Sequence, residues 1–179
     1  MAQKKRRKRN FSFPRILLWL ALIAYLLLLF KVILFKFDRN TIISILNDTD
    51  ELAYTRVNLV PFQTIRFYLF SGRVATSIAI RNLAGNIIAF MPLGVLIPLL
   101  RRNLSLCTTF LVGLGLSTFI ELTQWLTGLG SCDIDDIILN VLGAMSITLI
   151  LCVLDIIVFL MKFFAKFVQK SIDKKRRRV

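Results

Sequence analysis

The 179-residue sequence contains no histidine, 3 cysteines, and 10 acidic residues against 24 Lys and Arg. Without imidazole, Ser-His-Asp and Cys-His catalysis are excluded, and so are metal sites that require histidine. Cys107, Cys132 and Cys152 are widely spaced and form no C-x-x-C pair, which argues against a disulfide framework or a thiolate metal site. Any chemistry must therefore use carboxylates, amides, hydroxyls, Lys, Arg or Tyr.

Long polar stretches are also missing. Hydrophobic residues make up 56% of the chain and 15 residues are Phe, which is too apolar for an ordinary soluble domain. A net charge of +14 in a soluble protein would suggest nucleic acid, but here the basic residues crowd into the two ends of the chain. We therefore expect no nucleic acid, and we expect anionic lipid to be the partner of both basic tails.

Four apolar stretches are long enough to cross a bilayer, whose hydrocarbon core takes about 20 helical residues. We expect spans at about residues 14–35, 83–100, 104–126 and 133–157. The first follows six consecutive basic residues, and no small-residue cleavage site comes after it. It is therefore predicted to be a retained anchor and not a signal peptide.

The segments beside these spans are predicted to lie at the membrane interface. Residues 38–81 mix aromatic, apolar and charged side chains, which is typical of an interfacial or re-entrant segment, with a short amphipathic helix at 38–51. Beyond the fourth span, a lysine recurs every four residues among phenylalanines, which predicts an amphipathic helix on an anionic leaflet. Within the spans, Pro92 and Pro98 predict a kink or an early end, and Gly113 with Ser117 permits close helix contact.

The sequence thus predicts an all-α integral membrane protein with four transmembrane helices. Its parts are a basic tail at 1–13, a membrane domain at 14–157 and a basic amphipathic tail at 158–179. Most Lys and Arg residues lie in the tails and in the turn at 101–103, whereas most acidic residues lie on the other side. By the positive-inside rule, both termini are expected in the cytoplasm and residues 121–140 outside it.

Residues 121–140 gather polar groups in an otherwise apolar region. Ionisable groups cost about 2.5–3.5 kcal/mol at the centre of a membrane helix, so several kept together indicate a functional site. At 1.5 Å per residue, three spans carry polar residues over the same outer depth. These are Asn82 and Asn86, Glu121 and Gln124, and Asp133, Asp136 and Asn140. We expect them to face one another in a pocket open to the outside.

Structural roles compete with this interpretation. Asp133 and Asp136 could serve only as the N-cap and first-turn acid of the fourth span. Asn86 and Asn140 could simply hydrogen-bond between helices. Glu121 is harder to explain in this way, because a lone carboxyl two turns inside an apolar helix needs a donor, a cation or a proton.

Three segments together resemble the VanZ-like family of membrane proteins. They read NLVPF at residues 58–62, RNLAGNIIAFMPLG at 81–94, and ELTQ at 121–124 leading to DIDDIILNVLG at 133–143. The resemblance covers about residues 55–150. It implies a multi-pass protein of the bacterial cytoplasmic membrane, with teicoplanin resistance as the namesake activity and a remote similarity to enzymes that cut or exchange lipid headgroups.

The polar positions that match the family are Asn58, Asn86, Glu121, Gln124, Asp133, Asp135, Asp136 and Asn140. Relatives often carry Arg where this chain has Gly130. An anion bound there in relatives would need Arg56, Arg66, Arg73 or Arg81 here.

Two functions remain compatible with these residues. In the first, an enzyme hydrolyses or transfers a phosphate-linked headgroup of a phospholipid or a lipid-linked cell-wall precursor. Glu121 would be its general base, with Asp133 and Asp136 as further catalytic residues. Asn58, Asn86, Gln124, Asp135 and Asn140 would bind the substrate. In the second, the same pocket binds a glycopeptide antibiotic, a lipid or a partner protein without catalysis.

No cofactor is required by either reading. A divalent cation remains possible, because Asp133, Asp135 and Asp136 offer the oxygen ligands that hard cations prefer. The D-x-D-D spacing is not specific for metal.

Overall fold

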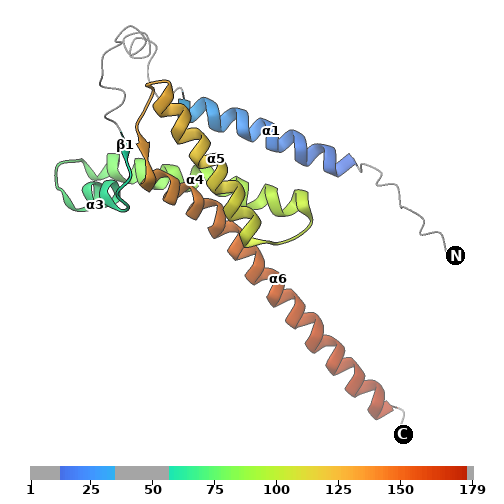
Figure 1. Cartoon of the computed structure of the whole chain (residues 1–179). Coiled ribbons are helices and arrows are strands. Elements are labelled where there is room, and N and C mark those ends of the chain that lie inside the picture. Colours follow the sequence, from blue (N-terminus) through green and yellow to red (C-terminus); the bar gives the residue numbers. More distant parts are fainter. Residues whose placement is uncertain (1–12, 35–56, 177–179) are drawn as a thin grey trace, which may run out of the picture.

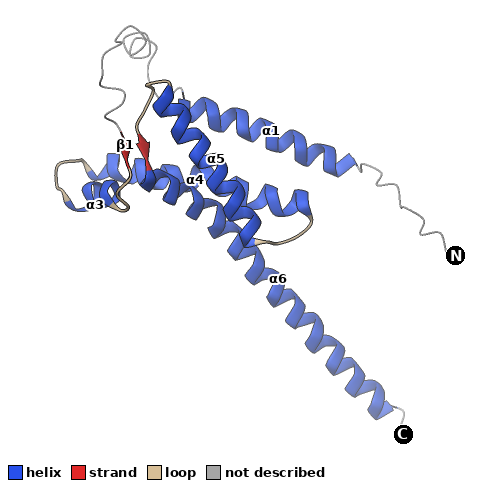
Figure 2. Ribbon diagram, viewed as in Figure 1, coloured by secondary structure: helices blue, strands red, loops and turns tan. Residues whose placement is uncertain are grey.

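The computed structural model describes residues 13–34 and 57–176, which are almost entirely helical (Figure 2). The elements in chain order are α1 (Phe13–Leu34), β1 (Val57–Asn58), α3 (Gln63–Phe70), α4 (Thr76–Arg101), α5 (Leu106–Leu126), β2 (Cys132–Asp133) and α6 (Ile134–Arg176). Four of these helices, α1, α4, α5 and α6, are long and apolar enough to cross a membrane. The predicted all-α membrane fold is confirmed. The short helix predicted at residues 38–51 lies outside the described residues.

Helix α4 is longer than predicted and runs through both prolines to Arg101. Pro98 has no N–H, so the carbonyl of Gly94 loses its helical donor. The hydroxyl of Thr148 on α6 donates to that carbonyl instead, at 2.9 Å. Of the two outcomes that the prolines predicted, a kink or an early end, the early end was wrong. A neighbouring helix supplies the hydrogen bond that Pro98 removes.

Helices α4 and α6 approach so closely that their backbones touch. A Cβ atom on Gly94 would collide with the carbonyl oxygen of Ala144, and one on Gly143 would collide with the carbonyl oxygen of Ile87. Only glycine fits at such a crossing. This contact holds α4 and α6 in a fixed register.

The predicted close contact of the Gly113 and Ser117 face of α5 is confirmed. A Cβ atom on Gly113 would lie 3.6 Å from the Cβ of Ala144 on α6, and one turn further along α5 the hydroxyl of Ser117 accepts a hydrogen bond from Asn140. Apolar side chains from all four long helices, including Phe90 and Ile120, form the core beside this contact. Helix α1 joins it through Tyr25, whose hydroxyl donates to the carbonyl of Ala89 on α4 at 2.9 Å.

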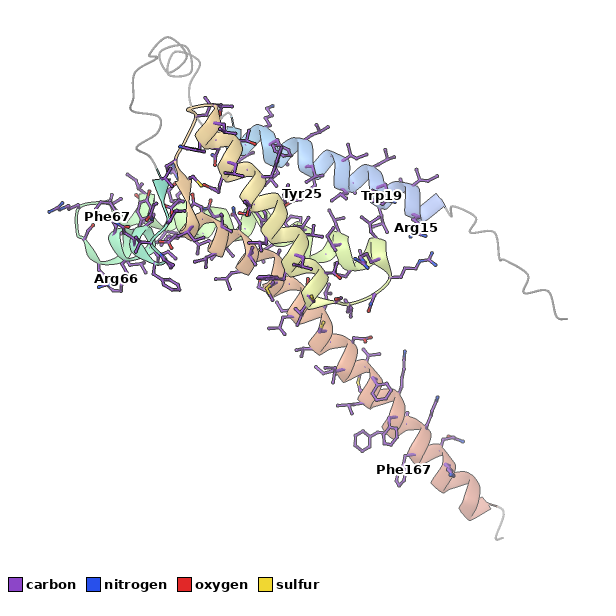
Figure 3. All side chains as sticks on the ribbon, viewed as in Figure 1. Arg15, Trp19, Tyr25, Arg66, Phe67 and Phe167 are labelled. Atoms are coloured by element: carbon purple, nitrogen blue, oxygen red, sulfur yellow. The ribbon has the colours of Figure 1, made fainter. Side chains whose placement is uncertain are left out.

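Helix α6 is one continuous helix of 43 residues. We predicted a span ending near residue 157 and a separate tail helix after it. At 1.5 Å per residue the helix is about 65 Å long, twice the thickness of a hydrocarbon core of about 30 Å. Its second half extends away from the other described helices (Figure 1), and Phe167 lies on that half (Figure 3).

The described part of the segment predicted to be interfacial, residues 57–81, forms β1, a turn, helix α3 and the start of α4. Strand β1 pairs in parallel with β2, with Val57 opposite Cys132 and Asn58 opposite Asp133. This two-residue ladder was not predicted, because neither strand has the length or alternation that marks a strand in a sequence. It fixes α3 beside the start of α6, where Arg66 and Phe67 point outward (Figure 3).

The two ends of the helical bundle differ in chemistry. At one end the guanidinium of Arg15 on α1 donates to the carbonyl of Leu100 on α4, close to the basic turn. At the other end, Val32 of α1 and Arg81 of α4 line a common cavity. Most of the predicted site residues lie at this second end.

Candidate functional site

A cavity of about 310 Å³ lies at the end of the bundle where α4 and α6 begin and α5 ends. All four long helices contribute to its wall. The lining residues are Val32, Arg81, Asn82, Gly85, Asn86, Ala89, Glu121, Gln124, Asp136 and Asn140. Seven of these ten residues carry polar or charged side chains.

The structure brings five of the eight sequence-predicted site residues to this cavity: Asn86, Glu121, Gln124, Asp136 and Asn140. The other three, Asn58, Asp133 and Asp135, are not among the lining residues. They lie at the junction of β1, α3 and α6 next to it.

Glu121 is buried, with 2% of its surface exposed. Its Oε2 atom accepts a hydrogen bond from the backbone N–H of Asp133 at 3.1 Å. The donor that this carboxyl needs therefore comes from β2, after the chain has turned at Gly128 with a positive φ of 71°. The same side chain lines the cavity, so Glu121 joins the site to the turn that follows α5.

Asp133 holds β1 to the start of α6. Its carboxylate accepts hydrogen bonds from the amide of Asn58 at 3.1 Å and from the hydroxyl of Thr64 at 2.5 Å. It also accepts the backbone N–H of Asp135 at 2.9 Å, as a helix N-cap does. The sequence offered N-capping as a structural role for Asp133. The structure shows this role together with hydrogen bonds from Asn58 in β1 and Thr64 in α3.

Asp135 is fully buried and anchors the first turn of α3. Its two oxygens accept the backbone N–H groups of Phe62 and Ile65, the latter at 3.0 Å. A carboxylate is favoured there because the N–H groups of a helix start lack helical partners. Depth along one helix could not reveal this role, since the donors lie about 70 residues earlier in the chain.

The three aspartates therefore point to different partners and do not converge. Asp136 accepts a hydrogen bond from the amide of Asn86 across the cavity, whereas Asp133 and Asp135 face α3. Within residues 13–34 and 57–176, no group of three acidic or thiol side chains is placed to hold a metal ion. The D-x-D-D spacing serves hydrogen bonding between elements in this structure.

Asn140 and Arg81 have hydrogen-bonding capacity that the described residues do not use. The amide nitrogen of Asn140 donates to the hydroxyl of Ser117 at 2.9 Å, but its buried Oδ1 has no partner in the described part of the chain. Arg81 is exposed at the cavity wall, and its guanidinium has no hydrogen bond or ion pair with any described residue. The site thus offers one unused acceptor inside and one unused cation at its edge.

Arg81 was named from the sequence only as one of four possible replacements for the arginine that relatives carry at position 130. A Cβ atom on Gly130 would lie 3.2 Å from the side chain of Gln124, which lines the cavity. Arg81 lines the same cavity from α4, whereas Arg66 and Arg73 do not, and Arg56 lies outside the described residues. Asn82 also lines the cavity, and its amide donates to the hydroxyl of Tyr68 on α3 at 2.9 Å.

Cys132 lies beside the site, in β2, outside the membrane-spanning helices. Burial raises the pKa of its thiol above the ordinary value, and the nearby carboxyls of Glu121 and Asp133 raise it further. A thiol with a raised pKa is a poor nucleophile at neutral pH. We therefore assign Cys132 no catalytic role.

Fold and cavity together define an α-helical multi-pass membrane protein with a polar cavity enclosed by its long helices at one end. The sequence model of the VanZ/LLP1 family matches residues 22–166, and the chain belongs to that family. The chain is 29% identical over 119 residues to Protein VanZ of Enterococcus faecium, a match that covers 66% of this chain and 63% of that relative. The chain therefore spans less than two thirds of the length of that relative. No solved structure matches.

Proposed function

We propose that this protein acts on a phosphate-linked lipid headgroup at the outer leaflet of the bacterial cytoplasmic membrane, and that it contributes in this way to teicoplanin resistance. The substrate is a phospholipid or a lipid-linked cell-wall precursor. The observation that carries the proposal is the cavity itself. It places a guanidinium without a partner among residues 13–34 and 57–176, two carboxyl side chains and four amides in one small space of about 310 Å³ within a membrane bundle.

The size of the cavity favours a headgroup over a whole antibiotic. Ligand pockets for drug-sized molecules measure about 300–1,000 Å³. This cavity stands at the lower end of that range, and a glycopeptide is much larger than a typical drug. A headgroup also brings its own anchor, because its acyl chains stay in the surrounding lipid.

Arg81 supplies the cation that a phosphate needs. A guanidinium recognises phosphate oxygens through two parallel N–H donors. Arg81 stands at the cavity wall without an internal partner in the described residues, so it keeps its donors for a ligand.

Glu121 supplies the proton transfers, with Asp136 as an ionised neighbour. Glu121 accepts the proton of a water or alcohol whose oxygen attacks the phosphorus, and the bond from phosphorus to the leaving oxygen breaks. The leaving oxygen takes up the proton that Glu121 has accepted. Both side chains line the cavity, whereas Asp133 does not, so Asp133 is assigned a positioning role through its backbone N–H on Glu121.

The cavity is assigned to the extracytoplasmic face by charge. Both tails and the turn after α4 are rich in Lys and Arg, which stay in the cytoplasm. The contact of Arg15 with the carbonyl of Leu100 groups the start of α1 with that turn, and the cavity lies at the opposite end.

A second function, binding without catalysis, is favoured by a different observation. Hydrogen bonds between the polar side chains already bridge the helices, from Asn86 to Asp136 and from Asn140 to Ser117. Hydrogen bonds that link the helices in this way suit a module that holds a lipid or a partner protein in place.

The two functions are separated by replacing Glu121 with Gln in cells that lack other resistance genes. The expected result is a headgroup change in mass-resolved membrane lipids and a gain in teicoplanin resistance with the wild-type protein, and loss of both with Glu121→Gln. Asp155→Asn is the matched control, because Asp155 is an exposed carboxyl far along α6. Resistance that survives Glu121→Gln without any lipid change would support the binding module. Full resistance in both Glu121→Gln and Arg81→Gln cells would rule out this cavity altogether.

A further inference from the structure

The charged groups of the cavity are ordered by depth. Arg81 is exposed near the start of α4, and Asn86 lies five residues further, about 7 Å deeper along the helix. Asn86 donates to Asp136, so this carboxyl lies at the deeper level. The wall is therefore cationic at the rim and acidic below it.

Asn140 forms the deepest polar point of this wall. It follows Asp136 by one helical turn, about 6 Å, and it contacts Ser117, which precedes Glu121 by one turn. Asn140 is 3% exposed, and its Oδ1 lacks a donor within the described residues. A buried carbonyl oxygen without a donor is uncommon in folded proteins, so it points to a donor that a ligand brings.

A ligand that suits this gradient must carry a negative group outward and a hydrogen-bond donor inward. Two carboxyl side chains next to the unpaired oxygen favour a donor that is also a cation. A primary ammonium has three N–H donors and a positive charge. It can bind the carbonyl oxygen of Asn140 while it lies between Glu121 and Asp136.

We propose that the cavity selects an amine-bearing zwitterionic headgroup of the phosphoethanolamine type, with its phosphate on Arg81 and its ammonium directed toward Glu121, Asp136 and the Oδ1 of Asn140. This inference rests on the proposed headgroup function and names its ligand class. It requires no redox partner and no metal, because it concerns recognition alone.

The test uses the purified full-length protein and short-chain phospholipids titrated in detergent. Dioctanoyl phosphatidylethanolamine and phosphatidylcholine have the same net charge, so non-specific attraction to the basic tails is equal for both. We expect the ethanolamine lipid to bind about tenfold more tightly, the difference that one or two charge-assisted hydrogen bonds make. The N,N-dimethyl lipid separates size from hydrogen bonding. It keeps one N–H with most of the bulk of choline, and it should bind more tightly than choline.

Variants assign the two ends of the headgroup. Arg81→Gln should weaken both lipids in parallel, whereas Asn140→Leu should remove the preference for ethanolamine. Asn140→Asp, which keeps an acceptor at the same place, should retain that preference. It also serves as the second variant if Asn140→Leu does not fold. Free phosphoethanolamine that competes with the lipid would support the same recognition by the headgroup alone.

Two outcomes would contradict the proposals, and they are distinguishable. Equal or tighter binding of phosphatidylcholine that still depends on Arg81 would overturn the amine preference and leave the headgroup function standing. Absence of any Arg81-dependent binding of either lipid would overturn the headgroup function and this inference with it.

Discussion

Single carboxyl groups in this protein perform different tasks at almost adjacent positions. Asp135 is fully buried and holds two backbone N–H groups of α3, whereas Asp136, the next residue, lines the cavity. The difference arises because consecutive side chains of a helix point about 100° apart. One therefore faces α3 and the other faces α4.

Replacing Asp135 with Ala should destabilise the fold without touching the cavity wall. The change leaves the N–H groups of Phe62 and Ile65 without their acceptor, which we expect to lower the free energy of unfolding by about 2–3 kcal/mol. Thermal unfolding of the purified protein in detergent measures this loss, with Asp155→Asn as the exposed control. A melting temperature like that of the control would show that α3 is held by other contacts.

The pH dependence of alkylation at Cys132 can report whether the neighbouring Glu121 side chain is charged. The raised pKa of the thiol means that the reactive thiolate forms only at higher pH. In a Cys107→Ser, Cys152→Ser background, alkylation of Cys132 should therefore rise with pH later than alkylation of a simple thiol, whose pKa is about 8.5.

Glu121→Gln removes one of the two charges that raise this pKa, and it should move the alkylation midpoint back toward lower pH. The shift should be partial, because burial is the larger cause. A midpoint that does not move would show that Glu121 carries no negative charge while Cys132 titrates. Rates of maleimide labelling followed by mass spectrometry give the midpoints.

Sequence reasoning could place Asn86, Glu121, Gln124, Asp136 and Asn140 at one depth, because helical rise alone fixes depth. Depth selected Asp133 together with them, and Asp135 entered the predicted site only through the family resemblance. Their partners, Asn58, Thr64 and the start of α3, come from a segment whose position depends on the two-residue pairing of β1 with β2. No local pattern in the sequence encodes that pairing.

At the scale of elements, α4 and α6 depend on each other. Pro98 opens a gap in the hydrogen bonding of α4, and Thr148 of α6 closes it at the carbonyl of Gly94. The sequence showed the proline but not its compensation, which is why a kink or an early helix end was expected. The unbroken length of α6 was missed for a related reason. The change from apolar to basic residues marks a change of environment, not an end of the helix.

A double-mutant cycle tests this dependence. Thr148→Val keeps the shape of the side chain but leaves the carbonyl of Gly94 without its donor, and it should cost about 1–3 kcal/mol of stability. Pro98→Ala restores a backbone N–H at position 98, so Thr148→Val should cost clearly less in that background. Equal costs in the two backgrounds, measured by unfolding in detergent, would show that Thr148 acts through other contacts, such as its hydrogen bond with Thr109.

At the scale of the whole molecule, the basic residues and the polar cavity lie toward opposite ends of the helical bundle. Most basic residues lie toward the ends of the chain and the turn after α4, and the cavity lies at the other end of the bundle. Such a separation is predictable from sequence, because it needs only the number of spans and the positive-inside rule. The cavity wall itself is not, since it depends on the glycine crossing that fixes the register of α4 against α6.

The orientation can be tested by labelling single cysteines in intact cells. In a cysteine-free background, Ser131→Cys lies exposed in the turn before β2, next to the cavity, and Asn103→Cys lies exposed in the turn after α4. We expect a membrane-impermeant maleimide to label position 131 in intact cells and position 103 only after the membrane is opened. Labelling of position 103 from outside would place the cavity in the cytoplasm, where it could not reach an outer-leaflet headgroup, and the proposed site of action would be wrong.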